Sequence, residues 1–160
     1  MTFVAGTPLS AAALNAALPG SIRCQGHLTA TSASIAANTA TRITGYTEDY
    51  ETVAMMDGST GLITIPSSGV YLVTAGMQIN SFATAYRRSL VVETGSGTAG
   101  TGTELVRDEV ESTDRVGLSI AKEIYLTAGT VISAYVNLEA SGTIQGASYV
   151  CWFGAILMGA

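Results

Sequence analysis

Apolar side chains are concentrated in two neighbouring runs near the middle of the chain, within GLITIPSSGVYLVTAGMQIN at positions 61–80. The runs cover 62–65 and 70–79, and both are rich in the β-branched and aromatic residues that favour strands. Between them, Pro66 cannot donate a ladder hydrogen bond, and Gly69 can adopt a positive φ where the chain reverses. The pattern predicts a hairpin of two strands. The weak alternation of the second run predicts that both its faces are covered.

Short apolar or alternating stretches recur along the chain beyond residue 22, at the regular spacing of a sandwich or barrel. The predicted strands lie at 25–34, 41–46, 53–56, 86–93, 104–110, 116–126, 130–138, 143 onward and 149–158. The stretches between them are polar or glycine-rich, as in loops. The main predicted loops are 48–51 (EDYE), 95–102 (GSGTAGTG) and 111–115 (ESTDR).

The last predicted strand, 149–158, carries bulky apolar side chains on both of its faces. A terminal strand of an antiparallel sheet normally has one face in water, so this strand is expected to lie centrally in its sheet with both faces covered. A second sheet can cover one face and a neighbouring subunit the other, which predicts an obligate oligomer. The expected subunit-interface or core residues are Tyr71, Tyr125, Tyr149, Trp152, Phe153 and Ile156.

Composition supports this fold class and narrows the range of partners. The 160 residues correspond to one domain, with only 12% charged residues and 18 glycines, a profile that favours an all-β domain. A formal net charge of −5 argues against nucleic acid as the main partner. No stretch approaches the roughly 18 apolar residues of a membrane span. Neither nucleic acid nor a spanned membrane is therefore expected as a partner.

Residues 1–22, MTFVAGTPLSAAALNAALPGSI, differ from the rest because they contain no charged side chain. Pro8 in the first turn, an apolar helical face and the stop at Pro19-Gly20 predict a short helix. A helix this short is marginal alone, so it packs either on its own domain or in a larger assembly. The second alternative makes residues 1–23 an attachment arm, joined to a domain at 24–160. The arm would bury Phe3, Leu9, Leu14 and Leu18.

The arm contains the pattern FxxGxxLSAAxLN at positions 3–15. This pattern resembles the opening of many tailed-bacteriophage structural proteins, which often begin with an aromatic residue, a glycine and then Leu-Thr-Ala-x-x-Leu-Asn. The resemblance implies an arm that attaches the protein to a phage head or tail.

Few residues in the sequence could carry chemistry. Two cysteines, Cys24 and Cys151, make no disulfide framework, and with the single His27 they cannot complete a four-ligand zinc site. We interpret both as reduced strand cysteines and leave open whether they pair. No serine lies in a nucleophile-elbow motif that would pair with His27, and the loop 95–102 lacks the Gly-Lys-Ser/Thr ending of a phosphate loop. The prediction is a protein that is not an enzyme, with no metal and no cofactor.

A second resemblance covers about residues 25–160. The stretch DGSTGLITIPSSGVYLV at 57–73 has a spacing similar to Tyr-Asp-x-x-x-Gly-x-Phe-x-x-Pro-x-x-Gly-x-Tyr-x-Phe, which lies near the middle of complement globular-head domains. LTAGTVI at 126–132 resembles the Leu-x-x-Gly-Asp-x-Val start of a later strand, and 149–158 resembles the final Ser-x-Phe-x-Gly-Phe-Leu-Leu strand. The chain departs from the family at Thr130, where aspartate is usual, and in the sequence Cys-Trp-Phe-Gly at 151–154.

The chain therefore resembles the complement globular-head and tumour-necrosis-factor jelly rolls. The resemblance implies an antiparallel two-sheet jelly-roll sandwich that forms homotrimers. Some members of this family bind calcium, so the resemblance leaves open calcium binding by one acidic loop of this chain. We interpret the acidic clusters at 48–51 and 104–114 first as solvated segments that keep an apolar assembly soluble.

Together these features predict a non-enzymatic structural protein of a phage virion, assembled in the host cytoplasm. It would form a trimeric jelly-roll knob, attached by residues 1–23 to the capsid, as a decoration protein or head fibre, or to the tail as a minor tail protein. The alternative is a tip protein of the tail that binds a host receptor or carbohydrate. Its contacts would then come from the loops 47–50, 95–102 and 111–115.

Overall fold

The structure, a computed structural model, describes residues 22–29, 32–80, 82–146 and 151–159. Within these ranges all the assigned helices and strands are β-strands. The described residues contain no helix long and apolar enough to cross a membrane. The strands are β1 (Arg23–Leu28), β2 (Ser32–Ile35), β3 (Thr41–Arg42), β4 (Tyr46–Glu51), β5 (Met56–Asp57), β6 (Leu62–Thr64), β7 (Gly69–Ile79), β8 (Tyr86–Thr94), β9 (Thr103–Ser112), β10 (Val116–Leu126), β11 (Val131–Leu138), β12 (Gly142–Gln145) and β13 (Trp152–Gly159).

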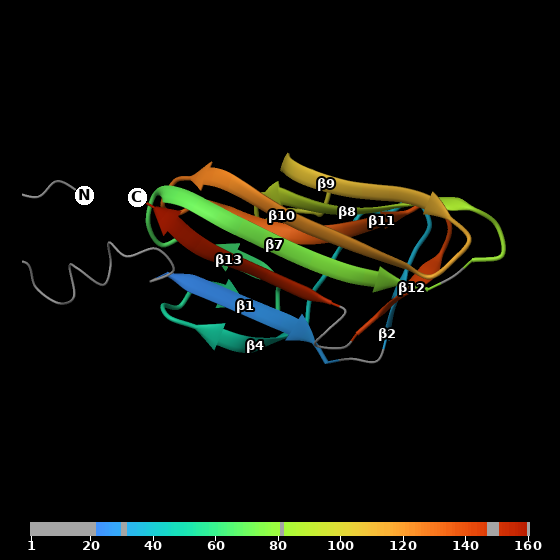
Figure 1. The fold of residues 1–160 in the computed structure, drawn as a ribbon, viewed down its shortest axis with the longest axis horizontal. Helices are drawn as coiled ribbons and strands as arrows, with labels where there is room; N and C mark the ends of the chain where they lie inside the picture. Colours follow the sequence, from blue (N-terminus) through green and yellow to red (C-terminus); the bar gives the residue numbers. More distant parts are fainter. Residues whose placement is uncertain (1–21, 30–31, 81, 147–150, 160) are drawn as a thin grey trace, which may run out of the picture.

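The strands form two antiparallel sheets that lie face to face (Figure 1). Sheet A has the order β2-β12-β7-β13-β1-β4, and β10 pairs with the other side of β7. Sheet B has the order β5-β6-β11-β8-β9, and β3 pairs with β11. These pairings confirm the predicted all-β, antiparallel two-sheet fold.

The core lies between the two sheets. Side chains alternate along each strand, so one set from each sheet points into this space. Tyr71, Val73 and Phe153 from sheet A and Leu90 and Ile132 from sheet B are fully buried members of this core. The hydroxyl of Tyr71 donates a hydrogen bond of 2.8 Å to the carbonyl oxygen of Ser67, so this buried polar group is satisfied.

The predicted hairpin at 61–80 is wrong in its pairing, although both strands form. β6 belongs to sheet B and pairs with β5 and β11, whereas β7 belongs to sheet A. Residues 65–68 carry the chain from one sheet to the other. Ile65 donates to the carbonyl of Thr130 and accepts from the amide of Gly129, both at 2.8 Å. Gly69 opens β7 and is not among the glycines with a positive φ.

The loop predicted at 48–51 is wrong, because this segment is part of β4. β4 is an edge strand, and four of its six residues are exposed, so polar residues can form it without burial. The carboxylate of Glu51 accepts hydrogen bonds from the amides of Met55 and Met56 at 2.6 and 2.5 Å, which fixes the turn after the strand. The strands predicted at 25–34 and 41–46 are each interrupted, giving β1 and β2, then β3 and the start of β4.

The central position predicted for the last strand is confirmed, because β13 lies between β7 and β1 in sheet A. The predicted arm helix and attachment residues lie outside the described residues, so the division at residue 23 stays a prediction. The described part of the chain enters the sandwich at Ile22, whose carbonyl accepts from the amide of Leu157 at 2.8 Å.

Candidate functional site

The face of sheet A that points away from the core carries exposed apolar side chains. We call it the outer face of sheet A; its apolar residues are Val70, Leu72, Tyr125, Trp152, Ile156 and Met158. Tyr125 is 65% exposed, Met158 39% and Val70 36%, and the other three are half-buried. Contiguous exposed apolar patches often mark interaction surfaces, whereas single exposed apolar residues are ordinary on protein surfaces.

Strand pairing brings these residues together although they are far apart in sequence. Tyr125 of β10 lies opposite Val70 of β7. Leu72 of β7 lies opposite Ile156 of β13, and Gly159, next to Met158, lies opposite Val70. The patch therefore extends across β10, β7 and β13, the three strands that lie side by side in Figure 1.

Trp152 lies further along the same face, where β7 carries a glycine. A Cβ atom built on Gly76 would come within 2.2 Å of the indole ring of Trp152. The ring therefore packs directly on the backbone of β7, and any side chain at position 76 would displace it. This close approach fixes the only tryptophan of the chain on the outer face of sheet A.

Charged and polar groups border the apolar residues. On β1, Arg23 lies opposite Ile156, and on β10, Glu123 lies opposite Leu72. Further along, Nδ1 of His27 lies 2.5 Å from Oδ1 of Asp49, both partly exposed to solvent. An apolar centre with a polar border is the usual arrangement of a protein interface.

The residues that were predicted for the interface or core fall on two different faces. Tyr71 and Phe153 are core residues, whereas Tyr125, Trp152 and Ile156 lie on the outer face of sheet A. The sixth residue of this set, Tyr149, lies outside the described residues. The same holds for the residues predicted for the attachment arm, which are Phe3, Leu9, Leu14 and Leu18. Sequence reasoning did not assign Val70, Leu72 and Met158 to a face. Strict counting of every second residue from Tyr71 would have separated Val70 and Leu72 from the core.

The two thiols do not form a disulfide. Cys24 lies opposite Ala155 in the β1–β13 ladder, whereas the carbonyl of Cys151 accepts from Leu28 at the far end of β1. Burial raises the pKa of each thiol to about 12, so neither is a reactive thiolate at neutral pH. The described residues hold no group of three or more His, Cys, Asp or Glu side chains able to share a metal ion.

The segments expected to contact a host ligand do not form a single cluster of loops. Residues 47–50 belong to β4 of sheet A, and residues 111–112 still belong to β9 of sheet B. The glycine-rich segment 95–102 is a loop, as predicted, and it follows β8. The C-terminal end of this loop is held by Glu93, whose carboxylate accepts hydrogen bonds from the amides of Gly100 and Gly102, each at 3.0 Å.

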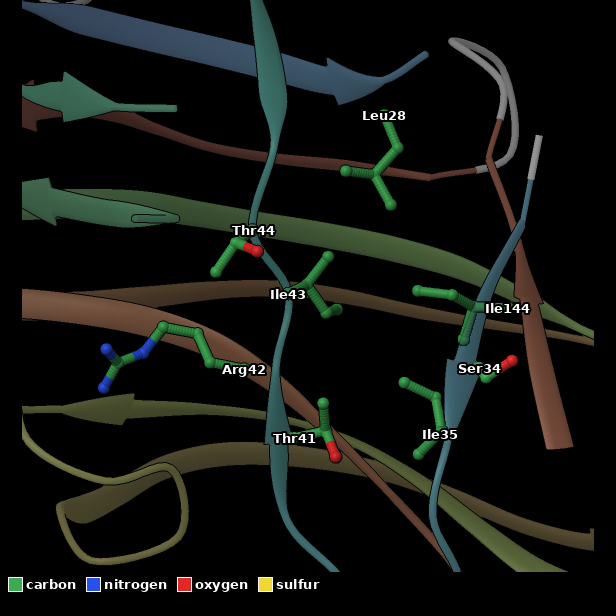
Figure 2. Close-up of a pocket in the computed structure, with 8 residues that line it drawn as sticks. All are labelled: Leu28, Ser34, Ile35, Thr41, Arg42, Ile43, Thr44 and Ile144. Atoms are coloured by element: carbon green, nitrogen blue, oxygen red, sulfur yellow. The ribbon is translucent and has the colours of Figure 1, made fainter. Parts of the chain in front are cut away.

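A second feature is a pocket of about 150 Å³ at one side of the sandwich (Figure 2). In Figure 2, Ile35, Ile43 and Ile144 point toward one another between β2 and the segment that contains β3. The pocket is lined by Leu28, Ser34, Ile35, Thr41, Arg42, Ile43, Thr44 and Ile144. Residues from the start and the end of the chain meet here, which no local sequence pattern indicates.

Comparison with known proteins supports the fold. No protein-family model matches the chain, and no curated protein matches it. Among solved structures, Eiger TNF from S. frugiperda matches with a TM-score of 0.65 at 14% identity, over 85% of this chain and 91% of that chain. Murine APRIL matches with a TM-score of 0.65 at 11% identity, over 85% of this chain and 98% of that chain.

The globular domain of zebrafish complement 1qA matches with a TM-score of 0.55 at 13% identity, over 83% of this chain and 94% of that chain. None of these three names denotes an enzyme. Identities this low establish the fold alone. The described chain has the two-sheet jelly roll found in tumour-necrosis-factor and complement 1q domains.

Proposed function

We propose that this protein is the subunit of a homotrimeric, non-enzymatic jelly-roll knob of a tailed-phage virion. Its subunits associate through the outer face of sheet A, and residues 1–23 attach the knob to the capsid or tail. The observation that carries the association is the set of neighbouring exposed apolar side chains at Tyr125, Val70 and Met158.

The residues of this patch support its cover by a protein surface. Tyr125 is the most exposed large apolar residue of the described chain, and the half-buried Leu72, Ile156 and Trp152 continue the surface from it. Burial of apolar area contributes about 25 cal/mol per Å², and aromatic anchors usually dominate an interface. A second copy of the chain is the occupant proposed here, and the number three follows from the resemblance to the complement and tumour-necrosis-factor jelly rolls.

Attachment to a virion has separate support. The uncharged opening of the chain carries the FxxGxxLSAAxLN pattern that resembles phage structural proteins. In the proposed assembly the arm leaves the sandwich at Ile22, beside the end of β13. The arm is then free to bind a larger particle while the sandwich forms the trimer.

The first test measures the mass in solution of the full chain and of residues 22–160, both at micromolar concentration. The proposal expects three copies in each case, because the interface lies in the sandwich. A second measurement follows binding of both proteins to purified tailed-phage particles, and only the full chain should bind. A monomeric sandwich would overturn the trimer, whereas equal binding or no binding by the two proteins would overturn the arm.

A further inference from the structure

The outer face of sheet A carries an ionisable pair beside its apolar residues. β13, β1 and β4 lie side by side in this sheet (Figure 1). Nδ1 of His27 on β1 lies 2.5 Å from Oδ1 of Asp49 on β4, and on its other side His27 lies opposite Trp152 of β13. Side chains that lie directly opposite each other on one face have Cβ atoms about 5 Å apart. A molecule that covers Trp152 therefore also covers this pair.

The pair is already partly withdrawn from water and held in place. The side chain of His27 is 16% exposed and that of Asp49 is 29% exposed. Asp49 is the extra residue of a β-bulge, because the register of β1 and β4 shifts between Gln25 and Gly26. Its carboxylate also accepts a hydrogen bond of 3.4 Å from the side-chain amide of Gln25. A partner subunit on this face would remove the water that remains around both groups.

The other charged side chains around the pair belong to different contacts. On β4, Glu48 and Glu51 lie opposite residues of β1 that point into the core, so their carboxylates lie on the other face of the sheet. On β1, Arg23 shares the face of the imidazole, but its guanidinium lies over the ring of Tyr50, 5.3 Å from the ring centroid. β13 adds an uncharged indole. Among the described residues, the imidazole is the one cationic group within ion-pair distance of Asp49.

The net charge of the pair depends on one proton. His27 is the single histidine of the chain, and histidine is the side chain that ordinarily changes its charge between pH 5 and 8. Covering an ionised carboxylate removes its water, which is costly unless a positive charge compensates it. A protonated imidazole supplies that charge, whereas a neutral imidazole leaves a net negative charge beneath the partner. Covering the pair therefore favours the protonated form.

We propose that the pair formed by His27 and Asp49 makes subunit association depend on pH, so that the chains assemble more tightly near pH 5.5 than near pH 8. The assembled state binds more protons than the free chain, and by linkage its formation is favoured as the pH falls. This inference rests on the association through the outer face of sheet A that is proposed above. It is independent of the attachment through residues 1–23.

The test is sedimentation equilibrium of the full chain over a concentration series at pH 5.5 and pH 8.0, at one ionic strength. The concentration at which half of the chains are assembled should be lower at pH 5.5 by roughly threefold or more. An NMR titration of the His27 ring should show that the ring keeps its proton to higher pH in the assembled chain. Equal concentrations at the two pH values would overturn the inference and leave the association standing. A chain that stays monomeric at both would overturn the association and the inference together.

Three variants separate the pair from a general effect of charge. His27→Gln removes the titrating group, so its assembly should be the same at both pH values, whereas an effect of the overall net charge of −5 would persist. Asp49→Asn leaves a protonated imidazole without a carboxylate, so pH 5.5 should now weaken association. Glu109→Gln removes one negative charge from β9 of sheet B and should keep the behaviour of the unaltered chain. A pH dependence that survives in His27→Gln, or an unchanged sign in Asp49→Asn, would contradict the inference.

Discussion

The outer faces of the two sheets differ in how they are covered. On sheet B, Val91 and Tyr135 are buried although they do not belong to the core between the sheets. They lie opposite each other in the β8–β11 ladder and face away from the core. On sheet A, the corresponding outward residues of β7 and β10 include Val70 and the largely exposed Tyr125.

The chain itself covers part of the outer face of sheet B. The loop 95–102 is tied down at one end by the buried carboxylate of Glu93 and along its first residues by the guanidinium of Arg42. A Cβ atom built on Gly100 would come within 2.9 Å of Ala40, so the loop lies close to the start of β3. Sheet A has no corresponding cover among the described residues. One outer face is therefore completed within the chain, and the other is the face that we propose a second copy completes.

The largest effect is expected from a charge on the outer face of sheet A. Val70→Asp places a carboxylate in the middle of the apolar patch and should weaken self-association more than tenfold, or above about 1.4 kcal/mol per interface. Val53→Asp is the matched control, because Val53 is 41% exposed and lies in the turn after β4. Sedimentation of the two variants over a concentration series measures the effect. Equal association of both would mean that the outer face of sheet A is not the interface.

The fluorescence of the single tryptophan adds a second readout of the same prediction. Trp152 is half-buried on the outer face, so its emission should shift to shorter wavelength as subunits associate. In Val70→Asp the emission should stay at the longer wavelength at every concentration. An emission maximum that is independent of concentration in the unaltered protein, while its mass changes, would place the contact elsewhere.

Period-two alternation allowed much of sheet A and sheet B to be predicted from sequence. The stretch 116–126 was predicted with the bounds that β10 has, and 130–138 differs from β11 by one residue. Both strands alternate strongly or carry continuous apolar residues between clear turns. The polar β4 has no such signal, because an edge strand need not bury the residues that form it.

What local pattern does not encode is the partner of each strand. Residues 62–65 and 70–79 are strands joined by a short connection, yet a sandwich can use such a connection to cross between sheets as well as to form a hairpin. Similarly, the pocket combines Leu28 with Ile144, and the apolar patch combines Val70 with Tyr125. These contacts depend on the long-range pairing, which no one segment specifies.

The cover that the loop 95–102 provides for the outer face of sheet B can be tested by substitutions at two glycines of the loop. A Cβ atom on Gly102 would lie 1.7 Å from the carbonyl oxygen of Thr94, so Gly102→Ala must displace backbone and should cost about 2 kcal/mol or more of unfolding free energy. In the same loop, a Cβ on Gly97 would meet only the hydroxyl of Thr101 at 3.6 Å, and Gly97→Ala should change stability by about 0.5 kcal/mol or less. Urea unfolding of both variants measures the difference. Equal costs would show that the loop is not fitted against β8.

The carboxylate of Glu93 holds the same loop by accepting hydrogen bonds from two of its amides. Removing one of these hydrogen bonds should reduce stability slightly less than Gly102→Ala does. Glu93→Gln replaces a carboxylate that accepts from two amides by a group with one acceptor oxygen, so an amide of the loop loses its partner. The expected loss is about 1–2 kcal/mol, together with faster hydrogen exchange at Gly100 and Gly102. Glu104→Gln, at an exposed residue of β9 that pairs with Arg107, is the control and should leave these two amides protected. Unchanged hydrogen exchange at these two amides in Glu93→Gln would show that the carboxylate of Glu93 does not hold the loop.

The last effect, which appears only at alkaline pH, concerns the two thiols in the core, Cys24 and Cys151. Burial raises the pKa of Cys24 and Cys151 from 9.0 to about 12, so the folded state disfavours the thiolate. The stability that the neutral thiols contribute is fully present below pH 9 and is lost as pH rises toward 12, by about 1 kcal/mol per thiol at pH 9.5. A variant with both cysteines changed to alanine should therefore lose less stability than the unaltered protein between pH 8 and 9.5. Both thiols should also resist a thiol reagent at pH 8 until urea unfolds the protein. Rapid labelling of the folded chain would mean that sheet A opens locally, and the exposed apolar residues of its outer face would then be a sign of weak packing instead of a partner surface.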